Sequence, residues 1–146
     1  IWARLMSLRH PENKMSKSSD DINGTIYFND SKESILKKFK SSVTDSENII
    51  KYDPELKPGI SNLIEIYAAI TDKEIKDSEK EFQNLQYGEF KIAVAETVVD
   101  YLEPIKKKYE ELTTNDIEDI VEKNLNLAQE SAAKTIMEVE EALGIN

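Results

Sequence analysis

The sequence predicts an all-α protein, a helical bundle preceded by an extended and loop-rich segment. Two observations favour this fold class. The 146 residues include only four glycines and four prolines, fewer turn residues than a β-sandwich or barrel needs. Beyond residue 30, apolar side chains recur every three or four residues, the spacing of one face of a helix. The length fits one domain with a sizeable core.

The N-terminal part is predicted to hold little regular structure. Residues 1–13 indicate an extended piece, and residues 14–24 a polar loop rich in Ser, Asp and Asn. Residues 25–28 form a short β-prone run. A first helix is then expected from a cap at Asn29 or Asp30 to about residue 40.

Four further helices are predicted after an irregular stretch at residues 47–59. Pro58 and Gly59 mark the turn before the second helix, which carries an apolar face from residue 60. The expected limits of the others are residues 72–84, residues 89–112 after a break at Tyr87-Gly88, and a last helix from a cap at Thr113 or Thr114 to a stop at Gly144.

Charge and composition exclude several kinds of protein. Residues 1–43 hold eight Lys/Arg and five Asp/Glu, a net charge of +3, whereas residues 44–146 hold 11 and 24, a net charge of −13. An acidic body argues against general coating of nucleic acid. No apolar run approaches the roughly 20 residues that span a bilayer, so no membrane association is expected. With no Cys and one His, no metal site is predicted.

The segment Lys14-Met15-Ser16-Lys17-Ser18 is the strongest chemical signal. It holds two ammonium groups, two hydroxyls and no acid. Prepositioned cations and neutral donors of this kind suit the binding of a polyphosphate and the stabilisation of charge on its oxygens. The alternative is a solvated loop with no chemical role.

This segment resembles the second signature of the class I aminoacyl-tRNA synthetases, and we call residues 14–18 the signature loop. Three later stretches resemble the bacterial-type tryptophanyl-tRNA synthetases in order and spacing. They are Lys40-Ser41-Ser42-Val43-Thr44-Asp45-Ser46-Glu47, residues 57–67 beginning Lys57-Pro58-Gly59, and Tyr87-Gly88-Glu89-Phe90-Lys91 with residues 95–99. One departure is Trp2, where the family usually has Gly.

The resemblance implies a tryptophan–tRNA ligase that uses ATP with Mg²⁺. It assigns Lys14 and Lys17 a catalytic role in holding the β- and γ-phosphates. Nucleotide binding is further assigned to Met15, Ser16, Ser18 and Leu5, with Met15 and Leu5 near the adenine. The resemblance also implies that Mg²⁺ accompanies ATP, with the phosphates as its main ligands.

The resemblance also implies an organisation into three parts. Residues 1–30 would end the nucleotide-binding catalytic domain, residues 31–59 would link, and residues 60–146 would form the helical anticodon-binding domain. The chain matches the C-terminal portion of the family, so alone it is expected to be inactive. Implied partners are tRNA(Trp), ATP and tryptophan, with a homodimer for the full-length enzyme. A cytoplasmic location is expected, and an organellar one stays open.

Two further expectations concern the alternatives and the loop. The alternative function is a non-catalytic helical module that binds tRNA or a protein, in which the signature loop would be a relic. In the absence of ATP and an upstream domain, nothing in this chain is expected to pin the signature loop, whereas the helices from residue 60 onward are expected to be well packed.

Overall fold

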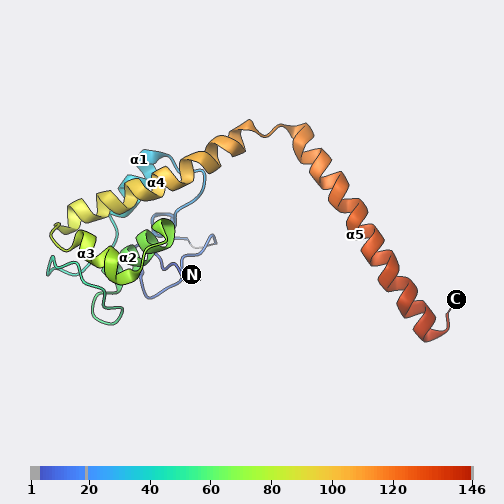
Figure 1. The fold of residues 1–146 in the computed structure, drawn as a ribbon, viewed down its shortest axis with the longest axis horizontal. Helices are drawn as coiled ribbons and strands as arrows, with labels where there is room; N and C mark the ends of the chain where they lie inside the picture. The colour runs from blue at the N-terminus through green and yellow to red at the C-terminus, as the bar shows by residue number, and fades with distance from the viewer. Residues whose placement is uncertain (1–3, 19, 146) are drawn as a thin grey trace. The chain divides into compact units, whose positions relative to one another are not determined.

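The computed structural model describes residues 4–18 and 20–145, and in these ranges it is helical without a β-strand (Figure 1). The elements are a 3-10 turn η1 (Ile22–Gly24) and the helices α1 (Lys32–Lys40), α2 (Pro58–Thr71), α3 (Ile75–Phe82), α4 (Tyr87–Glu111) and α5 (Thr114–Leu143). The predicted all-α class is confirmed. The β-prone run at residues 25–28 forms no strand.

The chain divides into two compact units, Ile1–Lys107 and Lys108–Asn146. The first unit holds the N-terminal loops, α1, α2, α3 and most of α4, and the second holds α5. Of the helices in the described part of the chain, none is both long and apolar enough to cross a membrane.

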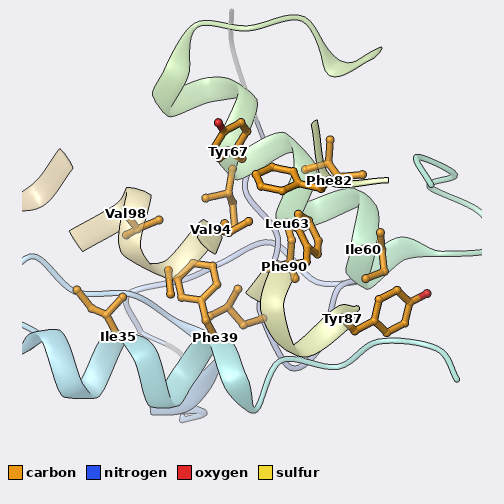
Figure 2. Packing of buried hydrophobic residues seen from close by; sticks show 14 of the residues in the cluster. Ile35, Phe39, Ile60, Leu63, Tyr67, Phe82, Tyr87, Phe90, Val94 and Val98 are labelled. Carbon is orange, nitrogen blue, oxygen red and sulfur yellow. The ribbon is translucent and has the colours of Figure 1, made fainter. Parts of the chain in front are cut away.

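The core of the first unit gathers apolar side chains from α1, α2, α3 and α4 (Figure 2). Phe39 of α1, Ile64 of α2 and the α4 residues Phe90 and Val94 are all fully buried. Burial of each such side chain stabilises the fold by about 1.5–3 kcal/mol. This core is the platform on which the N-terminal loops are placed.

Aromatic rings connect three of these helices. The ring of Tyr67 in α2 meets the ring of Phe82 in α3 edge-on, with centroids 4.6 Å apart. Phe82 in turn lies 5.0 Å from Phe90 of α4 at a tilt of 56° (Figure 2). These are the geometries that aromatic pairs prefer. The short, highly charged α3 is thereby fixed through its last residue.

The cap of α1 differs from the prediction. The N-cap is Ser31, whose hydroxyl accepts a hydrogen bond from the Ser34 N–H at 3.1 Å, and not Asn29 or Asp30. Asp30 has other partners, since its carboxylate accepts from the Tyr27 N–H at 2.8 Å and from Lys38. The serine is therefore left to satisfy the free N–H groups of the first turn.

Two helix limits also differ from the prediction. Asp72 does not begin α3, because it ends α2 in the left-handed conformation with φ of 55°. Tyr87 and Gly88 do not interrupt the helices, because both belong to α4. Asn48, 39 residues earlier, accepts the Tyr87 N–H at 2.7 Å, so a tertiary contact stabilises this helix start.

The second unit is described by itself. Thr113 and Asp116 form the reciprocal capping box of α5, and Gly144 ends the helix with φ of 67°, as predicted. No residue of α5 is buried, so the expected packing holds for α2, α3 and α4 to Leu102 and not for α5.

Candidate functional site

The signature loop begins at a short hairpin that contains a single antiparallel bridge, between Met6 and Lys14. The Met15 N–H donates to the Leu5 carbonyl at 3.0 Å, and the Ser7 N–H donates to the Asn13 carbonyl at 2.8 Å. These two bonds bracket the antiparallel bridge between Met6 and Lys14. The first half of the signature loop is therefore in register with residues 5–7.

Asn62 of α2 holds the other edge of this hairpin. Its amide oxygen accepts the Met6 N–H at 2.9 Å, and its amide NH₂ donates to the Met6 carbonyl at 2.9 Å. Asn62 is 3% exposed, and both bonds are directed to backbone groups that face away from Lys14. The hairpin is thus fixed to the helical core by a side chain.

The second half of the signature loop is held by the returning chain. The Thr25 hydroxyl donates to the Ser16 carbonyl at 3.1 Å, and the Tyr27 hydroxyl donates to the Lys17 carbonyl at 3.4 Å. The expectation that nothing in this chain pins the loop is therefore wrong. Sequence spacing does not reveal these bonds, because they join residues nine and ten positions apart across an irregular turn.

The side chains of the loop nevertheless face solvent. Lys14, Ser16, Lys17 and Ser18 are exposed, and Met15 is half-buried. Among the described residues, neither lysine forms an ion pair with a carboxylate. A backbone held in place with two unpaired ammonium groups is the arrangement that an incoming polyanion needs.

Lys38 of α1 organises the returning chain. Its ammonium donates to the Thr25 carbonyl at 2.8 Å and to the Asp30 carboxylate at 2.6 Å, and it lies 4.8 Å from the centre of the Tyr27 ring. Burial raises the pKa of the Asp30 carboxyl, but the bonds from Lys38, the Tyr27 N–H and Ser34 outweigh it and hold that pKa below 3.8. We call Thr25, Tyr27, Asp30 and Lys38 the Lys38 cluster.

A hollow of ≈ 560 Å³ opens beside the signature loop. Four of the six predicted site residues line it: Leu5, Lys14, Met15 and Lys17. The other two, Ser16 and Ser18, lie outside its lining, and their hydroxyl oxygens are 3.2 Å apart. The hollow therefore combines two cations with apolar surface.

This combination suits a molecule with a polyphosphate and a flat apolar group. The ammonium groups supply charge to phosphate oxygens, and Leu5 with Met15 supplies the apolar wall. Within the described residues, no group of three or more His, Asp or Glu side chains could hold a metal ion. A divalent cation at this site would need most of its ligands from the bound phosphates.

Comparison with known proteins gives the family. The family described as tRNA synthetases class I (W and Y) matches residues 1–103. The chain belongs to that family. Curated relatives named tryptophan–tRNA ligase include those of Oceanobacillus iheyensis, 45% identical over 99% of this chain, and Malacoplasma penetrans, 44% identical over 99%. The chain spans 45% and 44% of their lengths, less than half.

A solved structure agrees with this assignment to the class I synthetases. The crystal structure of tryptophanyl-tRNA synthetase from Mycoplasma pneumoniae matches 98% of this chain with a TM-score of 0.84 at 31% identity. The match covers 44% of that protein. The chain is thus similar to a part of these synthetases.

The synthetase-like stretches meet at a polar junction that the sequence did not predict. Asp45, Lys57 and Tyr87 come from the three stretches that resemble the tryptophanyl-tRNA synthetases, and one carboxylate oxygen of Asp45 accepts from Lys57 at 3.0 Å and from the Tyr87 hydroxyl at 2.7 Å. Glu47 adds a second ion pair to Lys57 at 2.6 Å. The one feature of the sequence that could have indicated this junction is that Asp45 and Lys57, which carry opposite charges, stand in two of these stretches.

Proposed function

We propose that this chain supplies the signature-loop half of the ATP site of a tryptophan–tRNA ligase. One observation carries the proposal most directly. Lys14 and Lys17 line one hollow, free of ion pairs among the described residues, on a backbone that other parts of the chain hold in place. Family membership and relatives that bear this name support the same function.

In the proposed reaction, the tryptophan carboxylate attacks the α-phosphate of ATP. A bond forms between the carboxylate oxygen and phosphorus, the bond to the bridging oxygen breaks, and pyrophosphate leaves with its electron pair. Charge therefore increases on the β- and γ-phosphate oxygens. Lys14 and Lys17 act by neutralising this charge, which is an effect larger in the transition state than in the ground state.

The remaining predicted residues take supporting roles. Met15 and Leu5 pack near the adenine, in line with their place on the wall of the hollow. Ser16 and Ser18 give hydroxyl or backbone donors to the phosphates. Mg²⁺ travels with ATP, and the phosphates provide most of its ligands. Among the described residues, the first unit offers cations for the phosphates and no cluster of carboxylates for the metal.

The partners follow from the second step of the reaction, in which the tryptophanyl group passes to tRNA(Trp). Residues 1–30 belong to the nucleotide-binding part, residues 31–59 link, and residues 60–146 approach the anticodon. Given the charge of −13 on residues 44–146, contacts with tRNA are local and few. We further propose a homodimer for the full-length enzyme and a cytoplasmic location, with an organellar one as the alternative.

The test uses the full-length gene product in tryptophan-dependent exchange of pyrophosphate into ATP. Lys14→Ala and Lys17→Ala should each lower kcat about 10²–10³-fold, as the loss of one donor to transition-state charge does in other enzymes. Tryptophan affinity should change little. Lys40→Ala, which removes an exposed lysine of α1, is the matched control and should retain full activity.

Two results would contradict the proposal. If Lys14→Ala and Lys17→Ala both exchange pyrophosphate at the wild-type rate, the signature loop is a solvated segment with no role in the reaction. Absence of tryptophan-dependent exchange in the full-length product, with retained binding of tRNA or a protein, would favour the non-catalytic helical module. The 146-residue chain alone should show no exchange, because it spans only 45% of the relative from Oceanobacillus iheyensis.

A further inference from the structure

We propose that Lys38 is a positioning residue for the signature loop. It contacts the two residues whose hydroxyls bond the Ser16 and Lys17 carbonyls, through the backbone carbonyl of Thr25 and the ring of Tyr27. Lys38 itself does not line the hollow. The inference rests on the proposed function, because it concerns how this chain prepares its phosphate-binding loop.

The geometry converges on one ammonium group. Lys38 is 3% exposed, and its three donors face a carbonyl, a carboxylate and an aromatic ring. The carbonyl belongs to Thr25 and the ring to Tyr27, whose hydroxyls bond the loop. Asp30 completes the cluster by accepting the Tyr27 N–H at 2.8 Å with the same oxygen that binds Lys38.

The hydroxyls of Thr25 and Tyr27 bond the backbone of the loop, and Lys38 contacts these two residues without lining the hollow. With the Ser16 and Lys17 carbonyls fixed, the peptide planes on either side are oriented and the stem of Lys17 starts from a defined point. A misplacement of about 1 Å at a reacting centre can cost about 10²-fold in rate. Loss of the Lys38 ammonium removes one contact from Thr25 and one from Tyr27 at once, so it should misplace the loop.

A further lysine reinforces the cluster from α4. The Lys106 ammonium donates to the Asp30 carbonyl at 2.5 Å, 76 residues away in the sequence. The Lys38 cluster therefore connects α1, α4 and the returning chain, all within the first unit. Among the described residues, Lys38 is the cation of this cluster that reaches both loop-bonding residues.

The test compares Lys38→Met with Lys38→Arg in the full-length gene product, using tryptophan-dependent pyrophosphate exchange. Lys37→Met is the matched control, since Lys37 is the preceding residue of α1 and is exposed. Rates are expressed per active site, counted by the burst of adenylate formation, so that a loss of folded protein does not lower them.

Lys38→Met should lower kcat per active site about 10–10²-fold and raise the KM for ATP, with the KM for tryptophan unchanged. Lys38→Arg should recover most of the loss, because a guanidinium can reach the same carboxylate and carbonyl. A purely structural role would lower the number of active sites and leave kcat per site and both KM values at wild-type level. That result would overturn the inference.

Two milder variants keep the proposal testable if Lys38→Met does not fold. Tyr27→Phe removes the hydroxyl that bonds Lys17, and Thr25→Val removes the hydroxyl that bonds Ser16. The double variant should show the same selective rise in the KM for ATP, and normal values would refute the inference. If the wild-type protein lacks tryptophan-dependent exchange while Lys14→Ala still weakens ATP binding, the proposed function fails for a distinct reason.

Discussion

Asp45 and Lys57 form an ion pair of 3.0 Å that fixes two irregular segments to the helical core. The Lys57 side chain is only 8% exposed. A lysine is rarely buried in a protein unless it has a charged partner, and here Asp45 is that partner. Hydrogen bonds from Lys57 to Glu47, Asp45 and Tyr87 outweigh burial and raise the pKa of Lys57 above its usual value of 10.5. The lowered pKa of Asp45 and the raised pKa of Lys57 both favour the charged forms of the pair.

Removing the Tyr87 hydroxyl should weaken this junction. Tyr87→Phe takes one donor from the half-buried Asp45 carboxylate, where the bond measures 2.7 Å. The same oxygen keeps its bonds from Lys57 and the Glu47 N–H, so the expected cost is that of one hydrogen bond to a charged group, about 1.5–3 kcal/mol in the free energy of unfolding. Urea denaturation of the 146-residue chain measures the change. Tyr101→Phe, at a tyrosine that is 52% exposed, is the control and should stay within about 0.5 kcal/mol of wild type.

Asp45 should also make stability depend on acid pH. Burial raises the pKa of Asp45, but bonds from Tyr87, the Glu47 N–H and Lys57 together hold it below 3.8. A depressed pKa means that the carboxylate stabilises the fold above 3.8, and that this contribution is lost as pH falls through the folded-state value. Asp45→Asn should therefore be less stable than wild type at neutral pH.

The stability gap between wild type and Asp45→Asn should narrow in acid. Urea midpoints of both proteins, measured from neutral pH to well below 3.8, provide the comparison. A gap of constant size across that range would show that the Asp45 charge does not contribute.

Tyr52 should produce the opposite dependence at alkaline pH. Its hydroxyl donates to Glu65 at 2.7 Å, and this bond, with burial and the carboxylate charge, raises the pKa of Tyr52 from 10.0 to about 12. A raised pKa gives stability that is complete below 10.0 and is lost as pH rises toward about 12. Tyr52→Phe should remove this component.

Spectrophotometric titration of tyrosinate would check the value directly. Tyr52 should ionise late in wild type, as should Tyr87, whose pKa burial and the bond to Asp45 also raise. In Tyr52→Phe the amplitude of the late ionisation should fall by one tyrosine. Tyr109→Phe, at a side chain that is 74% exposed, is the control and should keep the late step. Simultaneous ionisation of all tyrosines would contradict the assignment.

Gly59 should tolerate no side chain. A Cβ at this position would lie 2.0 Å from the Val43 carbonyl oxygen, a backbone atom that cannot step aside. Gly59→Ala should lower the free energy of unfolding by about 1–3 kcal/mol, the usual cost of overpacking. Gly88→Ala is the matched control, because nothing lies within 4 Å of its Cβ and the residue is helical. It should be neutral or stabilising by about 0.5–1 kcal/mol.

Local signals in the sequence predicted what local interactions determine. Helix α5 begins after Thr113 and ends at Gly144 as expected, since the partners of a capping residue lie within one turn of it. Ser31 capped α1 in place of Asp30, because Asp30 binds Lys38 eight residues away. The predicted break at Tyr87 failed for the same reason, since its partner Asn48 is distant in the sequence.

The same distinction between local and distant interactions applies to the candidate site. The residue types of the signature loop predicted a polyphosphate site, and the family resemblance assigned Lys14 and Lys17 to the phosphates and Leu5 and Met15 to the adenine. The structure brings these four residues to one hollow. The support of the loop was not predictable, because it depends on Lys38 meeting residues of an irregular turn. A periodic pattern marks Lys38 only as a polar position in a helix.

The double hydrogen bond from Asn62 to Met6 has a consequence for solubility. The N–H and carbonyl of Met6 face outward from the hairpin, as those of an edge strand do, and such an edge can pair with another chain and seed aggregation. The carboxamide of Asn62 occupies both groups just as a neighbouring peptide would. A residue of α2 thus takes the place of a missing strand and blocks edge-to-edge association at this point.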